Sequence, residues 1–448
     1  MFRKVLVANR GEIALRIIRA CRELGIKTVA IFSEADRPAL HVRLADEAFC
    51  VGPGQSARSY LNIPNIISTA LITGADALHP GYGFLAENAR FAQICEDHGI
   101  TFIGPSPDVI AQMGDKANAK EMMTRAGVPV IPGSGILSSL REARAAAATI
   151  GYPVILKATA GGGGRGMRRI LDESELETSL RSAESEAEAN FQDGRVYMEK
   201  LILQPRHVEV QVLADSHGEV VHLGERDCSI QKPSHQKLIE EAPAPALPDG
   251  VAERLTATAV TAARSCGYTN AGTLEFLVSG EDFYFMEMNT RIQVEHPVTE
   301  LIFGVDLVKE QIRIAFGERL GFAQSDLSPH GYAIECRINA EDPERDFAPA
   351  AGLVTAVELP GGPGIRVDTH VFAGLSIPPY YDSLLAKIIA VGRTRASALS
   401  RMERALAETR IEGVKTTTEL CRDIVCDPRF VQGGVPIDFL ESRLVGVA

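Results

Sequence analysis

The chain has 448 residues, of which 45% are hydrophobic and 23% charged, and its formal net charge is −12. This length exceeds one ordinary hydrophobic core and predicts two to four domains, while the negative charge argues against a general nucleic-acid binder, which needs a basic surface. The eight cysteines form no CxxC pair, and we see no signal peptide or membrane-length apolar run, so we expect reduced thiols, no membrane partner and a cytoplasmic enzyme.

The first hundred residues predict a doubly wound α/β domain. A strand at Lys4–Asn9 is followed by a helical pattern at Ile13–Leu24 and by a second strand at Thr28–Ser33. Glu34 lies where a dinucleotide-binding fold places its ribose-binding acid. The turn before the helix has a single glycine, however, and a pyrophosphate needs a closer backbone approach. We therefore expect the parallel sheet without the dinucleotide.

Two glycine-containing loops are candidate ligand sites. The sequence HPGYGFLAEN at 79–88 follows a strand end, where open α/β sheets bind ligands, although a structural turn explains it equally well. The second loop, GGGG at 161–164, follows a Pro- and Gly-rich hinge at 128–135 and a strand that carries Lys157. Bare N–H groups beside a lysine suit a triphosphate. The spacing excludes a Walker-type P-loop, and a flexible surface hairpin is the alternative.

Three further segments complete the middle and end of the chain. The strand at Val196–Leu203 carries an acid beside aliphatic residues, which suits a purine ring but also describes an ordinary amphipathic strand. Cys228–Glu241 has few apolar anchors, so we predict a solvent-facing loop. After His330 we expect mixed strands and helices, with strands at Tyr332–Ile338 and Leu353–Leu359 and a helix at 396–408.

The segment Thr273–Pro297 carries the densest polar pattern. Two strand-like runs flank a short turn, and a symmetric hairpin would place Glu275 opposite Glu287. Opposed like charges are unfavourable in a sheet unless a hard cation lies between them. Beyond the hairpin, every second position from 287 to 295 is polar, which puts these side chains on one face while the segment stays extended. A metal site is our first interpretation, and the solvated face of an edge strand is the alternative.

Taken together, these segments resemble the biotin carboxylases of the ATP-grasp superfamily, in particular the biotin carboxylase subunit of acetyl-CoA carboxylase, from Lys4 to about Leu440. The match rests on VLVANRGEIALRIIRA, HPGYGFLAEN, GDK, GGGGRGMR, ERDCSIQ with HQK, EEAPAP, and EFL with EMNTRIQVEHPVTE. The resemblance implies α/β and α+β domains: a Rossmann-like domain at 1–113, an ATP-grasp domain at 114–329 with a mobile lid at about 132–203, and a C-terminal α+β domain at 330–446.

The resemblance also implies an activity. ATP and bicarbonate would form carboxyphosphate, whose CO2 would carboxylate biotin on a separate carrier protein, since the chain has no Met-Lys-Met segment. Two Mg²⁺ or Mn²⁺ ions, carboxyltransferase subunits and a homodimer are implied as well, in the first half-reaction of acetyl-CoA carboxylase and fatty acid synthesis. The alternatives are a pyruvate, propionyl-CoA or methylcrotonyl-CoA carboxylase, another ATP-grasp ligase, and a regulatory protein that binds nucleotide without catalysis.

Matching the family's motifs residue by residue assigns the site. ATP would contact Lys116, Lys157, Gly163, Gly164, Glu199, Lys200, Leu201, Ile202, His207, Gln231, His235, Glu275 and Glu287, and the metals would contact Glu275, Glu287 and Asn289. Bicarbonate would contact Lys237, Arg291, Gln293 and Val294, with Glu295 as the general base. Tyr82 and Arg337 would bind biotin, and Arg337 would stabilise its enolate. The segment from Gln231 to Lys237 is one residue longer than the family's Gln-Arg-Arg-His-Gln-Lys.

Overall fold

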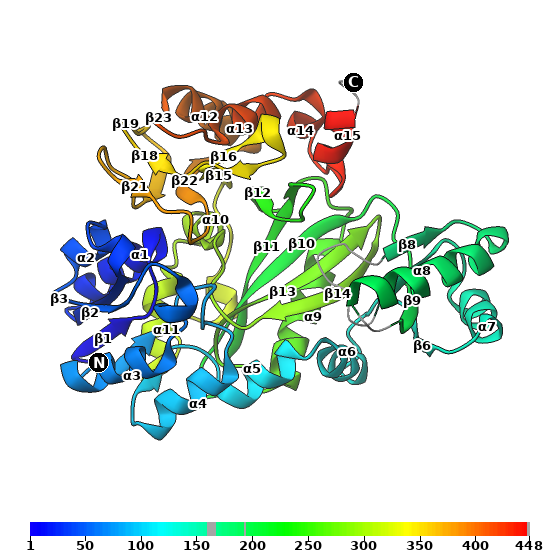
Figure 1. The fold of residues 1–448 in the computed structure, drawn as a ribbon, viewed down its shortest axis with the longest axis horizontal. Helices are drawn as coiled ribbons and strands as arrows, with labels where there is room; N and C mark the ends of the chain where they lie inside the picture. Colours follow the sequence, from blue (N-terminus) through cyan, green and yellow to red (C-terminus); the bar gives the residue numbers. More distant parts are fainter. Residues whose placement is uncertain (159–166, 192–193, 446–448) are drawn as a thin grey trace.

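The structure is a computed structural model that describes residues 1–158, 167–191 and 194–445 (Figure 1). The glycine loop that we predict to bind phosphates, with Gly163 and Gly164, lies outside these described residues. Among the described residues, no helix combines the length and the apolar character needed to cross a membrane.

The N-terminal sheet is parallel and has helices on both faces. Its order is β3-β2-β1-β4-β5, and the strands are Glu47–Gly52, Lys27–Ser33, Lys4–Val7, Ala77–His79 and Thr101–Phe102. In β1, Val5 and Val7 pack against α1 (Gly11–Glu23), whereas Leu6 packs against α3 (Ile63–Thr73) and α4 (Ala89–Asp97). Because successive side chains point to opposite faces, both faces are apolar, as a buried parallel sheet requires. The doubly wound fold is confirmed.

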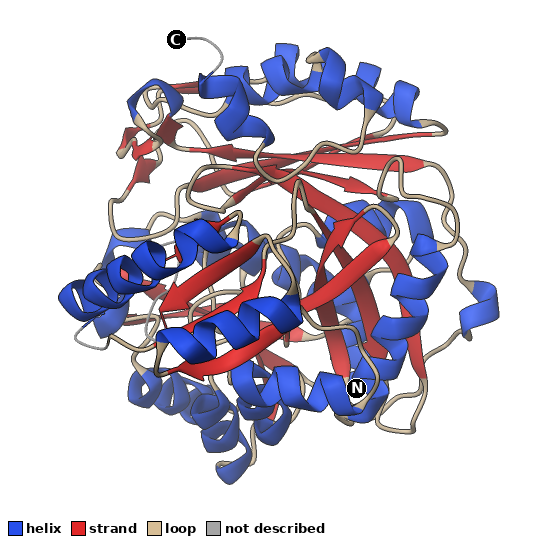
Figure 2. Ribbon diagram, turned by 90° about the vertical axis from the view of Figure 1, so that its right-hand side faces the viewer, coloured by secondary structure: helices blue, strands red, loops and turns tan. Residues whose placement is uncertain are grey.

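One antiparallel sheet of eight strands runs through the centre of the molecule (Figure 2). Its order is β14-β13-β10-β11-β12-β15-β22-β20, and the strands are Asp282–Asn289, Asn270–Ser279, Arg206–Ala214, Val220–Gln231, Lys237–Ala242, Tyr332–Asn339, Leu384–Gly392 and Ile365–Thr369. The pairing of β12 with β15 carries the sheet across the boundary that we predict at 329/330. The domain limits stay a prediction, and both sides of this boundary contribute to one sheet surface.

Helices pack against both faces of this sheet. On one face the cover is α6 and α9 near β10 and β13, and α12 and α13 near β15 and β22. The helices of the central and C-terminal parts are α5 (Pro107–Gly114), α6 (Lys116–Arg125), α9 (Val251–Ser265), α10 (His296–Phe303), α11 (Leu307–Ala315), α12 (Arg395–Glu408), α13 (Thr418–Val425), α14 (Pro428–Gln432) and α15 (Phe439–Val445). On the opposite face, α11 packs near the ends of β10 and β13, and α10 packs against β12, β15 and β22, so polar side chains share this face with apolar ones.

The hairpin of β13 and β14 places Glu275 opposite Glu287, as predicted. The strands pair from Ser279 and Asp282 onward, which in a regular ladder would put residue 286 opposite Glu275. Met286 is instead the extra residue of a β-bulge, and this insertion brings Glu287 into register. The opposed carboxylates therefore depend on a bulge that the alternation of residue types did not reveal.

A four-stranded sheet with two helices forms a separate body, which extends to the right in Figure 1. Its order is β6-β9-β7-β8, and the elements are β6 (Gly133–Leu137), β9 (Val196–Lys200), β7 (Val154–Ala158), β8 (Met167–Ile170), α7 (Leu140–Ile150) and α8 (Leu176–Phe191). Helix α7 begins after Ser139, whose hydroxyl accepts a hydrogen bond from the Glu142 amide. This body has its own hydrophobic core, which includes Leu156 and Leu180. The mobile lid at about 132–203 stays a prediction that this separate core supports.

Two sequence predictions are wrong. Cys228–Glu241 is not a solvent-facing loop, because β11 and β12 occupy most of it and its charges are buried in pairs, such as Lys232 with Glu341 at 2.6 Å. A lack of apolar anchors cannot reveal such pairing. The expected strand at Leu353–Leu359 is two short strands, β18 (Gly352–Leu353) and β19 (Ala356–Glu358), which pair with different partners.

The core behind the hairpin provides a stability prediction. Phe276 is fully buried, and its ring makes edge contacts with Phe283 and Phe285. Phe276→Ala should lower the free energy of unfolding by about 3–5 kcal/mol because it leaves a cavity. As the matched control, Phe316→Ala, at a ring that is 44% exposed, should cost about 0.5 kcal/mol. Urea unfolding followed by circular dichroism measures both, and equal shifts would contradict the assignment.

Candidate active site

The face of the central sheet opposite α6, α9, α12 and α13 carries a row of charged side chains. Glu209, Glu275 and Arg337 alternate along their strands with apolar residues that face the helices, so they project from the opposite face. Glu209 lies directly across from Glu275 in the pairing of β10 with β13. The sheet thus brings residues from distant parts of the sequence onto one surface.

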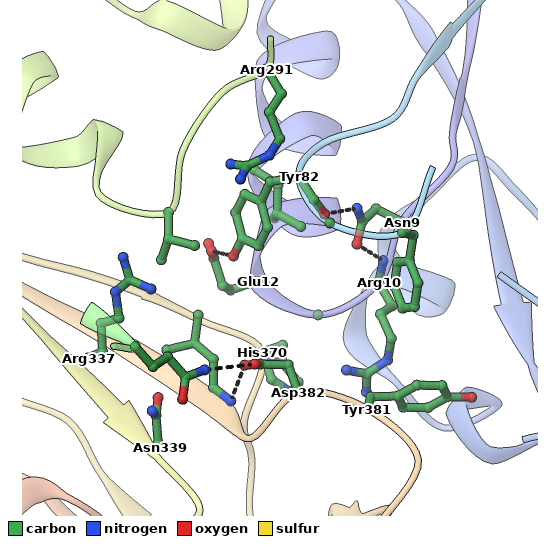
Figure 3. A pocket seen from close by; sticks show the side chains of 17 residues that line it. Asn9, Arg10, Glu12, Tyr82, Arg291, Arg337, Asn339, His370, Tyr381 and Asp382 are labelled. Carbon is green, nitrogen blue, oxygen red and sulfur yellow. Dashed lines mark hydrogen bonds between the residues drawn. The ribbon is translucent and has the colours of Figure 1, made fainter. Parts of the chain in front are cut away.

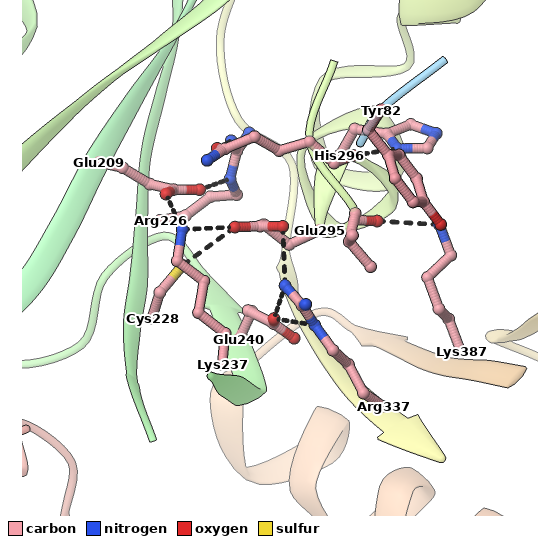
Figure 4. Close-up of polar contacts among 12 residues, drawn as sticks. Tyr82, Glu209, Arg226, Cys228, Lys237, Glu240, Glu295, His296, Arg337 and Lys387 are labelled. Carbon is pink, nitrogen blue, oxygen red and sulfur yellow. Dashed lines mark hydrogen bonds and ion pairs between the residues drawn. The ribbon is translucent and has the colours of Figure 1, made fainter. Parts of the chain in front are cut away.

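Lys237 is the centre of this cluster (Figure 4). Its ammonium lies 2.7 Å from Glu209 Oε2, 2.8 Å from Glu275 Oε1 and 2.7 Å from Glu295 Oε1. Burial alone lowers the pKa of Lys237, but the three carboxylates outweigh it and hold the pKa well above its ordinary value. A permanent cation therefore joins a predicted metal ligand to the predicted general base.

Arg226 also binds this cluster, although no sequence pattern had singled it out. Its side chain is fully buried, and it donates to Glu209 at 2.6 Å and to the amide oxygens of Gln211 and Gln293 at 2.9 Å. The polar alternation of β10 was the signal that could have indicated this pairing. Gln293, a predicted bicarbonate ligand, is oriented by this contact and also donates to Glu275 at 2.7 Å.

Arg337 approaches the predicted base from the C-terminal part of the sheet. It contacts Glu295 Oε2 at 2.9 Å and forms an ion pair with Glu240. Burial alone raises the pKa of Glu295, but the charges of Lys237 and Arg337 outweigh it and hold this pKa below its ordinary value. Burial raises the pKa of Glu240 to about 7, although Arg337 opposes the shift. Glu295 is therefore ionised at neutral pH. The carboxyl group of Glu240, in contrast, titrates close to neutral pH.

The polar row beyond the hairpin leaves the strand sooner than a long extended segment would. Strand β14 ends at Asn289, and residues 290–295 bend toward α10. Arg291 donates to Asn289 Oδ1 at 2.8 Å and to Glu87 at 2.8 Å. Because the chain turns here, Arg291, Gln293 and Glu295 surround one region instead of forming a straight row.

The predicted nucleotide ligands divide between the lid and the central sheet. In the lid, the carboxylate of Glu199 lies 2.6 Å from the ammonium groups of both Lys157 and Lys120. The ammonium of Lys200 donates to the backbone carbonyls of residues 151 and 152. Burial alone raises the pKa of Glu199, but the two lysines outweigh it and lower the pKa. The backbone amide of Leu201 donates to the carbonyl of residue 153, and Ile202 follows it at the end of the lid.

Four more predicted nucleotide ligands lie on the main body. His207 is 3.1 Å from Glu275 and within 3.0 Å of the Gln231 amide, so both are close to the carboxylate cluster. His235 lies apart, exposed in the turn between β11 and β12 with a φ of 61°. Lys116 is exposed and lies 3.2 Å from Glu287.

The carboxylates are suited to a hard cation. Glu275 and Glu287 face each other, and Glu209, Glu275 and His207 also bring ligand atoms within 4.8 Å of one another. Burial alone raises the pKa of Glu275, but Lys237 and His207 outweigh it and hold this pKa well below its ordinary value. The oxygen-rich donor set is the type that Mg²⁺ or Mn²⁺ prefers. Asn289 donates to Glu275 at 2.9 Å, which places its amide beside the same carboxylate.

A cavity of about 320 Å³ opens beside this cluster (Figure 3). Tyr82, Arg291, Val294 and Arg337 line it, so the two predicted biotin ligands and two predicted bicarbonate ligands share one space. Glu12 lines it as well and accepts a hydrogen bond from the Tyr82 hydroxyl. The site thus combines a carboxylate and cation cluster with a neighbouring cavity large enough for a small ring system.

Comparisons with known proteins identify the same three parts. Sequence models match for the biotin carboxylase N-terminal domain at residues 1–110, for the ATP-binding domain of the carbamoyl-phosphate synthase L chain at 115–323, and for the biotin carboxylase C-terminal domain at 335–442. Together they span most of the chain.

Similar proteins agree with this assignment. The biotin carboxylase of Nostoc sp. is 57% identical over 444 residues, which cover 98% of this chain and 99% of that protein. A pyruvate carboxylase subunit of Methanothermobacter thermautotrophicus is 54% identical, and the match covers 100% of this chain and 91% of that protein. A crystal structure of the biotin carboxylase domain dimer of Hydrogenobacter thermophilus 2-oxoglutarate carboxylase, in complex with MgADP, ADP and bicarbonate, is 53% identical with a TM-score of 0.90, and the match covers 99% and 98% of the two chains. This chain therefore belongs to the biotin carboxylase family.

Proposed function

We propose that this chain uses ATP to carboxylate biotin with bicarbonate, yielding carboxybiotin, ADP and phosphate. The carrying observation is the contact of Lys237 and Arg337 with Glu295 at the edge of the cavity that holds Tyr82. This arrangement supplies cations for an anionic acceptor, an ionised base for its proton and a pocket for a ring. The Hydrogenobacter relative, crystallised with MgADP and bicarbonate, supports the same substrates here.

ATP would lie between the lid and the central sheet. Glu199, Lys200, Leu201 and Ile202 would contact the adenine, because they lie at the junction of the lid with the main sheet. The remaining ligands in the proposal, for the phosphates and ribose, are Lys116, Lys157, Gly163, Gly164, His207, Gln231 and His235. The ammonium groups near Glu199 and Glu287 offset carboxylate charge in this structure and would turn to phosphate when the nucleotide binds.

Glu275, Glu287 and Asn289 would hold two Mg²⁺ or Mn²⁺ ions. When bound, the ions offset negative charge on the transferring phosphoryl group. The residues of this chain contribute the two opposed carboxylates, whose register the bulge at Met286 sets. Lys237 and His207 compensate Glu275 in the structure, so the carboxylate requires a cationic neighbour.

Bicarbonate would bind to Lys237, Arg291, Gln293 and the backbone of Val294, because a planar guanidinium pairs well with a planar anion. Glu295 would take the bicarbonate proton while a bicarbonate oxygen attacks the γ-phosphorus and ADP leaves. The resulting carboxyphosphate would break down to CO2 and phosphate. The phosphate would remove the ureido N–H proton, the nitrogen would attack CO2, and Arg337 would stabilise the enolate oxygen.

The partners follow from the reaction. Biotin would arrive at Tyr82 on a separate carrier protein, and carboxyltransferase subunits would receive the carboxyl group. We propose a cytoplasmic homodimer acting in acetyl-CoA carboxylase and fatty acid synthesis. The identity to the Methanothermobacter pyruvate carboxylase chain and to the 2-oxoglutarate carboxylase domain makes a keto-acid carboxylase the second candidate. Identifying the carboxyltransferase that co-purifies with the chain distinguishes the two.

The proposed base provides a direct test of the function. The wild type should cleave ATP in a manner that depends on bicarbonate and free biotin, and Glu295→Gln should lower kcat for biotin carboxylation by about 10²–10⁴-fold, since the amide accepts no proton. Glu310→Gln, at a buried acid paired with Arg313 outside the cluster, should leave kcat unchanged. Turnover with an amine acceptor in the absence of biotin would overturn the proposal.

The proposed metal ligands predict a change in magnesium dependence. Glu287→Gln should raise the Mg²⁺ concentration for half-maximal ATP cleavage by about tenfold, because one charged oxygen ligand is lost. Glu281→Gln removes an exposed acid from the turn of the same hairpin and should leave this concentration unchanged. Steady-state assays over a Mg²⁺ series measure the effect, and identical series for both variants would remove Glu287 from the metal site.

The raised pKa of Glu240 leads us to expect a pH effect on the biotin step. With a pKa raised to about 7, its carboxyl ionises between pH 6 and pH 9 and then shares the Arg337 charge that the ureido anion needs. As the pH rises, kcat/KM for biotin should therefore fall in the wild type relative to Glu240→Gln, whose amide does not ionise. The ratio of the variant's kcat/KM to that of the wild type should rise about tenfold from pH 6 to pH 9, as expected for one charge-assisted hydrogen bond. A ratio that stays flat, as expected for Glu310→Gln, would contradict this assignment.

A further inference from the structure

A second buried cation lies beside Arg337 on the neighbouring strand. Lys387 of β22 is directly opposite Arg337 of β15 in the sheet register, so both side chains project from the same face. Arg337 contacts the Glu295 carboxylate, and the Lys387 ammonium donates to the Val294 carbonyl at 2.8 Å. Two adjacent strands thus fix two consecutive residues of the proposed bicarbonate site.

The same ammonium reaches the biotin side of the cavity. Lys387 Nζ is 3.1 Å from Glu12 Oε1. This oxygen also accepts the hydrogen bond of the Tyr82 hydroxyl (Figure 3). Lys387 is fully buried, and Glu12 is 3% exposed. Because the Tyr82 proton points to Glu12, the phenol oxygen has only acceptor capacity left for a ligand in the cavity.

The charge of Lys387 is maintained by the groups around it. Burial alone lowers its pKa, but Glu12, Glu335 and Asp368 outweigh the burial and raise the pKa above its ordinary value. Asp368 lies opposite Lys387 on β20. The ammonium is therefore a fixed donor, and its contacts connect α1, the loop before α10 and the C-terminal strands.

We propose that Lys387 is a positioning residue that builds the bicarbonate and biotin sites together. Resting on the proposed function, this inference gives Lys387 two contacts: it fixes the Val294 peptide next to Glu295, and through Glu12 it holds Tyr82 as an acceptor. A biotin ureido group has a carbonyl oxygen and two N–H donors. Arg337 donates toward the carbonyl and Tyr82 accepts from an N–H, so the pair is complementary to a urea.

Two variants separate these contacts. Lys387→Met keeps the aliphatic stem but removes the donor, so the KM for bicarbonate and the KM for biotin should each rise by about tenfold or more, as expected when a charged buried donor is lost. Glu12→Gln leaves the contact of Lys387 with Val294 but disturbs Tyr82. It should raise the biotin KM by about tenfold and change the bicarbonate KM by less than about twofold. The KM for ATP should stay within about twofold in both.

A matched control tests for a merely structural effect. Arg395→Met, at the start of α12, breaks the ion pair of Arg395 with Glu241 of β12, whose charged groups are 2.7 Å apart. It should lower the melting temperature and leave all three KM values unchanged. Equal increases of all three constants in Lys387→Met, or an unchanged biotin KM in Glu12→Gln, would overturn the inference. If Lys387→Met fails to fold, Glu12→Gln decides alone, and a wild type without biotin-dependent ATP cleavage overturns the proposed function instead.

Discussion

The site depends on one lysine ammonium that is shared by three buried carboxylates. Lys237 lies within 2.8 Å of oxygens from Glu209, Glu275 and Glu295, and Arg226 neutralises Glu209 from the other side. A buried carboxylate without a partner would cost several kcal/mol, so the cluster exists only as a unit. Removing one cation would leave the charges of several acids uncompensated.

The continuous central sheet makes this sharing possible. Antiparallel pairing from β13 through β15 to β22 places side chains from residues 209 to 387 on one face, although they are far apart in the chain. Helices α6, α9, α12 and α13 pack on the apolar side of the same strands. Rigid strands hold such charges in a defined geometry more closely than loops do, and this explains why Arg337 and Lys387 can serve a site built mainly from the central part.

Local patterns revealed the elements of the site, but long-range pairing decided its chemistry. The period-2 alternation and the turn predicted a hairpin, because both signals lie within one short segment, and a turn symmetric about Glu281 would place Glu275 opposite Glu287. The structure reaches this pairing by another route, through a bulge. The bulge at Met286 was not predictable, since an extra residue changes no residue type. The loop prediction for Cys228–Glu241 failed because the partners that satisfy its charges, such as Glu341 for Lys232, come from another part of the chain.

The lowered pKa of Glu295 has a consequence for its proposed role as a base. Lys237 and Arg337 keep the carboxylate ionised, which proton transfer requires, but the same cations reduce its affinity for a proton. Bicarbonate would compete with the Glu295 carboxylate for Lys237, because both anions are attracted to the same ammonium. As the anion takes a share of that charge, the proton affinity of Glu295 rises at the moment when its substrate is present. With the proposed roles of Glu295 and Lys237, the cluster would couple acceptor binding to activation of the base, and a carboxylate without these cations would lack that coupling.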